Sequence, residues 1–164
     1  MKPIEIKAIT TSVNYFNSLE INEKIAETEA IHHTQPNVFL TILALSQDGV
    51  SMEKVDHALN ILLVIHKVFS DASNGRKIPL ISKGMLNDAL ESNIAMLQTI
   101  DQGWLTTDVS IKSYFENNVL AYLIGYLKKH DLLPPSKEHE RLIINLKTVL
   151  DSYANSRKCA KPTH

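Results

Sequence analysis

The sequence predicts an all-α fold, a compact bundle of about six or seven helices around a central apolar helix at residues 52–71. Apolar residues recur every three or four positions in successive segments, which is the period of an α-helix. Glycine and proline number only 5 and 6, too few for a turn-rich sandwich or barrel. No segment has the pattern of a strand–helix–strand unit.

Two helices are predicted ahead of Pro36. The first is short, and its apolar residues follow helical spacing: Ile6, Ile9, Val13 and Phe16. The second spans residues 18–33, with Asn17 or Ser18 as its N-cap. One of its faces carries Ile21, Ile25 and Thr28. Pro36 ends this helix, because a residue before proline disfavours helical geometry.

The third and fourth helices follow Pro36. This proline suits the first turn of the third helix, and Asp48-Gly49 ends that helix. Ser51 opens the fourth helix, at residues 52–71, whose apolar residues continue around most of the cylinder. A helix that is apolar on most sides is covered by its neighbours, so we expect this one at the centre of the bundle.

Three further helices are predicted in the second half of the chain. Residues 72–83 form the longest break, and Ser82 caps the fifth helix, which ends at Gly103. The sixth helix covers about residues 108–130, with Thr107 or Asp108 as its cap. Ser136 caps the last helix. The inward face of this helix is predicted to carry Leu142, Ile143, Leu146, Val149, Leu150 and Tyr153.

The chain is predicted to form one domain at residues 1–156, followed by a flexible C-terminal tail at residues 157–164. The formal net charge of −1 provides no field that attracts nucleic acid or an anionic membrane. The single cysteine, Cys159, leaves no internal disulfide to form. The longest apolar run, residues 61–65, is too short to span a bilayer. We therefore expect a soluble, cytoplasmic protein with no cofactor and no nucleic-acid or membrane partner.

Motifs that carry chemistry are sparse. The sequence has neither a G-x-S-x-G nucleophile elbow nor a glycine-rich nucleotide motif. Glu29 and His32 have the E-x-x-H spacing of helical metal sites, which places both side chains on one helix face. Such sites use the motif twice and the sequence has it once, so we interpret the pair as solvated surface residues.

His66 falls within the apolar stripe of the central helix. We expect its ring to be half-buried and neutral, with a carbonyl or hydroxyl as its partner. The alternative is a histidine that lines a pocket or senses pH.

Tyrosines concentrate in the predicted helix at residues 108–130, where Tyr114, Tyr122 and Tyr126 occur. Tyr122 and Tyr126 are one turn apart. Tyrosine offers apolar area with a polar tip, so this row suits a ligand groove or a protein interface. The alternative is an ordinary edge of the core.

These observations favour a non-enzymatic protein–protein interaction or regulatory module that binds another protein or a second copy of itself. The candidate interaction residues are Tyr114, Tyr122, Tyr126 and His66. One alternative is a ligand- or metal-binding protein, or an enzyme, that uses His66 or the Glu29/His32 pair. Another is a helix-turn-helix nucleic-acid binder built from residues 37–47 and the helix after Ser51. Carboxylates at Glu53 and Asp56 oppose this second alternative, because they would face phosphates.

Overall fold

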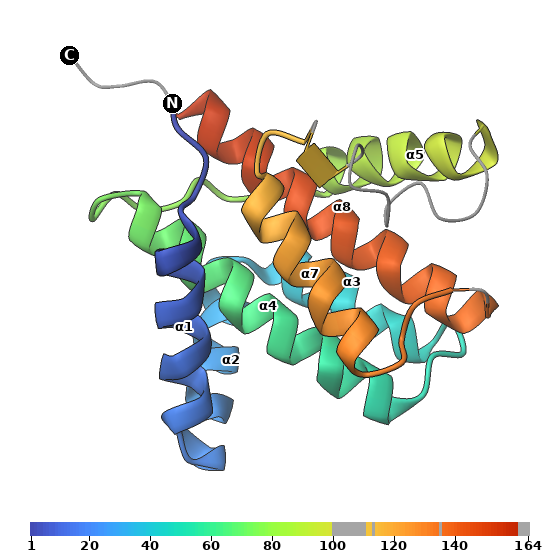
Figure 1. Cartoon of the computed structure of the whole chain (residues 1–164), viewed down its shortest axis with the longest axis horizontal. Coiled ribbons are helices and arrows are strands. Elements are labelled where there is room, and N and C mark those ends of the chain that lie inside the picture. The colour runs from blue at the N-terminus through green and yellow to red at the C-terminus, as the bar shows by residue number, and fades with distance from the viewer. Residues whose placement is uncertain (100–110, 113, 135, 161–164) are drawn as a thin grey trace.

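The computed structural model describes residues 1–99, 111–112, 114–134 and 136–160 (Figure 1). The predicted all-α bundle is confirmed, since the described residues contain helices and no strand. Seven α-helices lie wholly within them: α1 (Ile6–Ser18), α2 (Ile21–Thr34), α3 (Pro36–Leu43), α4 (Met52–Ala72), α5 (Lys83–Thr99), α7 (Asn117–Lys129) and α8 (Lys137–Cys159). A short 3-10 helix, η1 (Ala44–Ser46), follows α3. No described helix is both long and apolar enough to cross a membrane.

The central helix is α4, as its apolar pattern predicts. It runs from Met52 to Ala72 and packs against α1, α2, α3, α7 and α8. Its buried residues lie all around the cylinder: Val55, Ala58, Ile61, Leu62, Leu63, Val64, Ile65, Val68 and Phe69. Burial of this many aliphatic side chains is the main favourable contribution to the stability of the bundle.

The last helix, α8, forms the second half of the core. All six side chains predicted to face inward are buried: Leu142, Ile143, Leu146, Val149, Leu150 and Tyr153. The helix continues to Cys159, so residue 156 lies inside α8 and does not end it. Arg157 pairs at 2.5 Å with the carboxylate of Glu116, which anchors the end of the helix. Residues 161–164 of the predicted tail lie outside the described residues.

Two helices begin directly after the serine residues that were predicted to cap them. The hydroxyl of Ser82 accepts a hydrogen bond from the Met85 amide at 3.1 Å, and that of Ser136 from the His139 amide at 3.1 Å. The cap predicted for α2 at Asn17 or Ser18 is wrong, because α1 continues through both residues. Glu20 caps α2 instead, in a reciprocal capping box with Glu23.

The sixth predicted helix, at residues 108–130, is wrong as a single element. Its described part has a bend and turn at residues 114–116, and α7 begins only at Asn117. The cause is Glu116, whose fully buried carboxylate accepts from the Ile4 amide at 2.9 Å and pairs with Arg157. These distant partners hold Glu116 at φ −93° and ψ 54°, outside helical geometry. The predicted helix end at Gly103 and the predicted cap at Thr107 or Asp108 lie outside the described residues.

Candidate functional site

A groove of about 540 Å³ opens between α1, α4 and α7, with one residue of α2 on its rim. We call it the tyrosine groove. It is lined by Val13, Phe16, Asn17, Lys24, Asn60, Val64, Tyr122, Gly125, Tyr126, Lys129 and His130. Two of the four candidate interaction residues, Tyr122 and Tyr126, therefore lie together at one concave surface.

Both tyrosines of α7 line this groove. Their ring centroids are 6.2 Å apart in an edge-to-face arrangement, and both side chains are half-buried. The Tyr126 hydroxyl lies 2.9 Å from Nδ1 of His57 on α4, which fixes its ring. Burial raises the pKa of both phenols, so each stays neutral and keeps its proton at neutral pH.

Gly125 lies between these tyrosines, in the middle of α7. It lines the groove, and a Cβ atom built at this position meets no atom within 4 Å. The neighbouring helices therefore do not require a glycine here. Because glycine has no side chain, the backbone of α7 lines the groove at this position.

The charged residues of the groove are all basic. Its lining includes Lys24 and Lys129 and contains no carboxylate, and the described residues form no ion pair with either lysine. The ring of His130 lies 4.6 Å from that of His57 and 4.4 Å from that of Tyr126. Desolvation, followed by the nearby His57 and Lys129, lowers the pKa of His130. The two lysines thus provide the positive charge at neutral pH.

His66 is not part of the tyrosine groove and lines a separate, smaller pocket of about 170 Å³. Its ring is half-buried, with Nδ1 2.8 Å from the Tyr153 hydroxyl and Nε2 3.5 Å from the Ser70 hydroxyl. Burial lowers the pKa of His66, so the imidazole is neutral at pH 7. This matches the hydroxyl-bonded, neutral ring that the helical pattern predicts.

Ser70 and His66 are close enough to raise the question of a nucleophile and its base. The hydrogen bond of Tyr153 shows that His66 is not a base for Ser70. Among the described residues, the only acceptor for the buried Tyr153 hydroxyl is Nδ1 of His66. The Tyr153 proton therefore goes to Nδ1, and Nε2 carries the ring proton. Since Nε2 then donates, it cannot remove a proton from Ser70.

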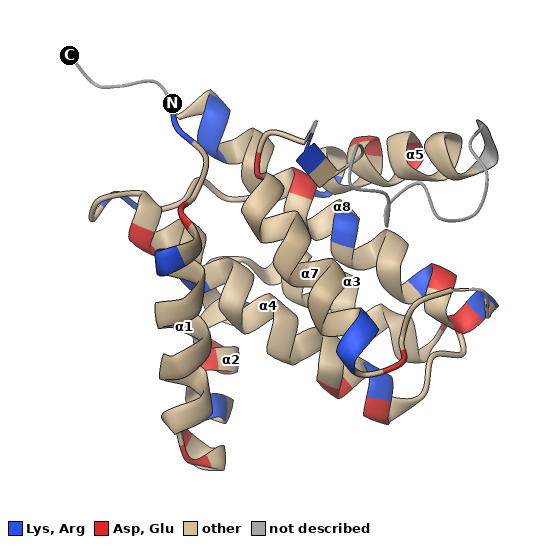
Figure 2. Ribbon diagram, viewed as in Figure 1, with Lys and Arg blue, Asp and Glu red and all other residues tan. Residues whose placement is uncertain are grey.

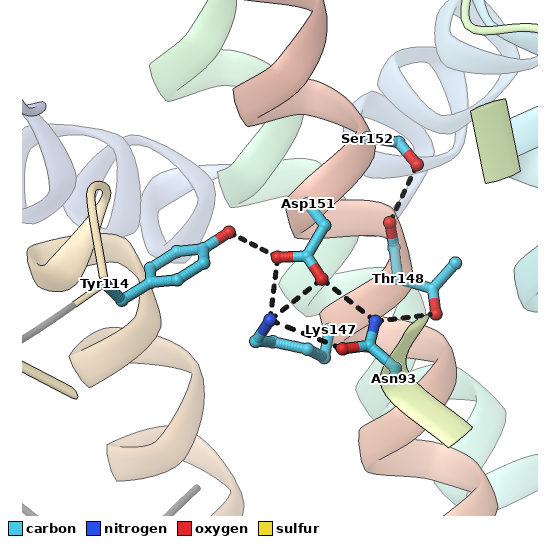
Figure 3. Close-up of polar contacts among 6 residues, drawn as sticks. All are labelled: Asn93, Tyr114, Lys147, Thr148, Asp151 and Ser152. Carbon is cyan, nitrogen blue, oxygen red and sulfur yellow. Dashed lines mark hydrogen bonds and ion pairs between the residues drawn. The ribbon is translucent and has the colours of Figure 1, made fainter. Parts of the chain in front are cut away.

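Tyr114 lies apart from the other two tyrosines, because the chain turns before α7 begins. Its hydroxyl donates to Asp151 of α8 at 2.5 Å, and the ammonium group of Lys147 lies 4.6 Å from the centre of its ring (Figure 3). Burial, followed by the nearby Asp151, raises the pKa of Tyr114 well above its usual range. Tyr114 is thus a neutral donor to Asp151, and the two residues line a separate pocket of about 560 Å³ and not the tyrosine groove.

A buried network joins α5, α8 and Tyr114 (Figure 3). Lys147 Nζ lies 2.8 Å from both carboxylate oxygens of Asp151, one turn further along α8. Asn93 of α5 donates to Asp151 at 2.9 Å and to the Thr148 hydroxyl at 3.2 Å. Asp151 already accepts from three donors, so it is a structural anion and not a free base.

The Glu29/His32 pair lies on the exposed surface of α2. The His32 ring stacks on that of Phe39, with centroids 4.7 Å apart. No cluster of three or more His, Cys, Asp or Glu side chains suited to a metal ion occurs in the described ranges.

Ser51 and Lys54 have the S-x-x-K spacing of some serine nucleophiles, which sequence reasoning missed. Lys54 instead pairs with Glu138 at 2.6 Å, and the Ser51 amide donates to the same carboxylate at 2.7 Å. The hydrogen bond from Lys54, followed by that from Ser51, lowers the pKa of Glu138. Lys54 is thus a paired cation that joins α4 to α8.

No family model, curated protein or solved structure matches this chain.

Proposed function

We propose that this protein is a non-enzymatic interaction module that binds a protein segment, from another protein or from a second copy of itself, in the tyrosine groove. The proposal rests on the presence of a glycine, Gly125, in the middle of α7. Glycine in the middle of a helix costs about 1 kcal/mol relative to alanine. Nothing within the fold requires it, because a Cβ atom would meet no neighbour within 4 Å. A locally unfavourable residue with no internal role is expected where a partner must approach closely.

The groove also has the composition of a binding surface. Phe16, Tyr122 and Tyr126 supply aromatic area, and tyrosines are enriched at protein interfaces. Lys24 and Lys129 lie beside them and lack carboxylate partners in the described part of the chain. The complementary partner is a segment with apolar side chains for the rings and carboxylates for the lysines.

The alternatives receive less support from the same structure. Three clusters resemble reaction centres, at His66, Asp151 and Lys54. In each of them the side chain is already held by a hydrogen bond or an ion pair. A helix-turn-helix nucleic-acid binder needs a second helix with one face exposed to contact the bases. Here that helix would be α4, which packs against five other helices.

The proposal is tested by selecting displayed random peptides against the wild-type protein and against Gly125→Leu. Leucine at this position adds a bulky side chain to the lining of the groove where a Cβ atom meets no neighbour, and it improves helix propensity. We therefore expect the variant to obstruct the site without weakening the fold. We expect wild type to enrich peptides that combine aromatic or aliphatic residues with Asp or Glu, and Gly125→Leu to bind them at least about tenfold more weakly, which is about 1.4 kcal/mol.

The matched control is Gly84→Leu on α5, where a Cβ atom makes only an ordinary contact at 3.7 Å with the Ser82 hydroxyl. This variant should bind the selected peptides as wild type does. Enriched peptides that bind wild type and Gly125→Leu equally would overturn the proposal, and so would a selection that enriches no peptide above background.

A further inference from the structure

We infer that the segment bound in the tyrosine groove is α2 of a second copy of this chain, so that two copies form a symmetric dimer. This inference rests on the proposed function, since it names the partner of the same groove.

The first observation is the unpartnered apolar face of α2. Ile21 is 73% exposed and Ile25 is 51% exposed, although both are large aliphatic residues. They lie one turn apart and so share a face of the helix. Ile31 is the one residue of α2 that is buried. The face is thus poorly covered within one copy, and a second copy can bury it.

The second observation is charge complementarity. Glu29 is exposed and lies one turn after Ile25 on the same face of α2, and the exposed Glu20 directly precedes Ile21. The tyrosine groove instead has Lys24 and Lys129, and the described residues that line it include no carboxylate. Figure 2 shows acidic positions where α2 begins and basic positions at the end of α7. The face of α2 therefore combines the apolar and acidic character that this groove requires.

The third observation is that the groove and α2 lie on the same side of the molecule, because Lys24 of α2 lines the groove. A two-fold rotation can then place each α2 against the groove of the other copy, and both sites are filled at once. Had the two surfaces been on opposite sides, the same contact would have been head-to-tail and would have produced a ring or an open filament.

The test uses sedimentation velocity of the full chain over a range of concentrations. We expect wild type to form a dimer, and Ile25→Glu and Gly125→Leu each to dissociate at least about tenfold more readily. Ile94→Glu on α5 is the matched control, because Ile94 is also exposed, at 40%, and lies outside both surfaces. It should dimerise like wild type.

A mixing experiment separates the two surfaces. Ile25→Glu keeps an intact groove, and Gly125→Leu keeps an intact α2 face, so an equal mixture restores one of the two contacts. We expect this mixture to associate more tightly than either variant alone and less tightly than wild type. A wild type that stays monomeric, variants that dimerise normally, or a mixture no better than its components would each overturn the dimer. If selected peptides still bind in a Gly125-dependent manner, the proposed function survives that failure.

Discussion

Replacing Lys147 with methionine tests whether the buried network holds α5 and α8 together. The Lys147 side chain is 6% exposed and that of Asp151 is 16% exposed, so their ion pair is largely removed from water. Methionine keeps most of the length and apolar volume of lysine but removes its charge. The Asp151 carboxylate then remains buried without its cation, and this is the main cause of the expected loss of stability.

The expected decrease in the free energy of unfolding depends on the hydrogen-bond partners that Asp151 keeps in the variant. Breaking a buried pair by removing one partner costs about 3–5 kcal/mol. Asp151 keeps neutral donors in Tyr114 at 2.5 Å and Asn93 at 2.9 Å, so we expect the lower end, about 3 kcal/mol. For a chain of this size that corresponds to a fall in melting temperature of about 6–12 °C.

The assay is urea unfolding followed by circular dichroism, with an unchanged denaturant slope as the check on two-state behaviour. Lys67→Met is the matched control, since Lys67 forms the same i,i+4 pair with Asp71 but the two side chains are 28% and 55% exposed. We expect Lys67→Met to lower the free energy of unfolding by less than about 1 kcal/mol. Adding Asp151→Asn to Lys147→Met should recover part of the loss, because it removes the unpaired charge. If Lys147→Met lost no more stability than Lys67→Met, the reasoning would be refuted.

Three further predictions concern stability. Gly125→Ala should raise the free energy of unfolding by about 1 kcal/mol in urea titrations, and an unchanged value would mean that Gly125 has an internal role. Ser156→Ala should raise it by about 1 kcal/mol, because the buried Ser156 hydroxyl has no partner among the described residues; a clear loss would contradict this. His66 has a pKa below 6.5 when folded, so the unfolded chain binds the proton more readily and stability should fall as pH drops below 6.5. His66→Gln should reduce that fall in unfolding titrations across this pH range, and an identical pH dependence would contradict the assignment.

The parts of the fold that could be predicted from the sequence are those decided within a few turns of chain. The central helix and α8 repeat their apolar residues at helical spacing over many turns, so their extent and buried faces follow from the pattern alone. Caps at Ser82 and Ser136 are also local, because each hydroxyl binds an amide three residues ahead.

The features that could not be predicted depend on distant partners. Glu116 ends up as the N-cap of α7 because its carboxylate binds Ile4, 112 residues away, and Arg157, 41 residues away. Similarly, Asn93 meets Lys147 only because α5 packs on α8. Spacing along the chain carries no information on which helices become neighbours.

The candidate site was predictable in part. The spacing of Tyr122 and Tyr126 shows that they share a face of α7, but the residues opposite them, Phe16 and Lys24, come from other helices and required the fold. Gly125 offered a further signal, since a lone glycine within a helical pattern is unfavourable unless something needs the space.

We propose that the tyrosine groove is a binding surface and that the fold does not require it. The most direct measurement compares Gly125→Leu with wild type in two titrations, one with urea and one with a single selected peptide. We expect Gly125→Leu to resist urea better than wild type and to bind the peptide with a larger Kd. A variant that holds the peptide as tightly as wild type, or that unfolds more easily, would contradict it.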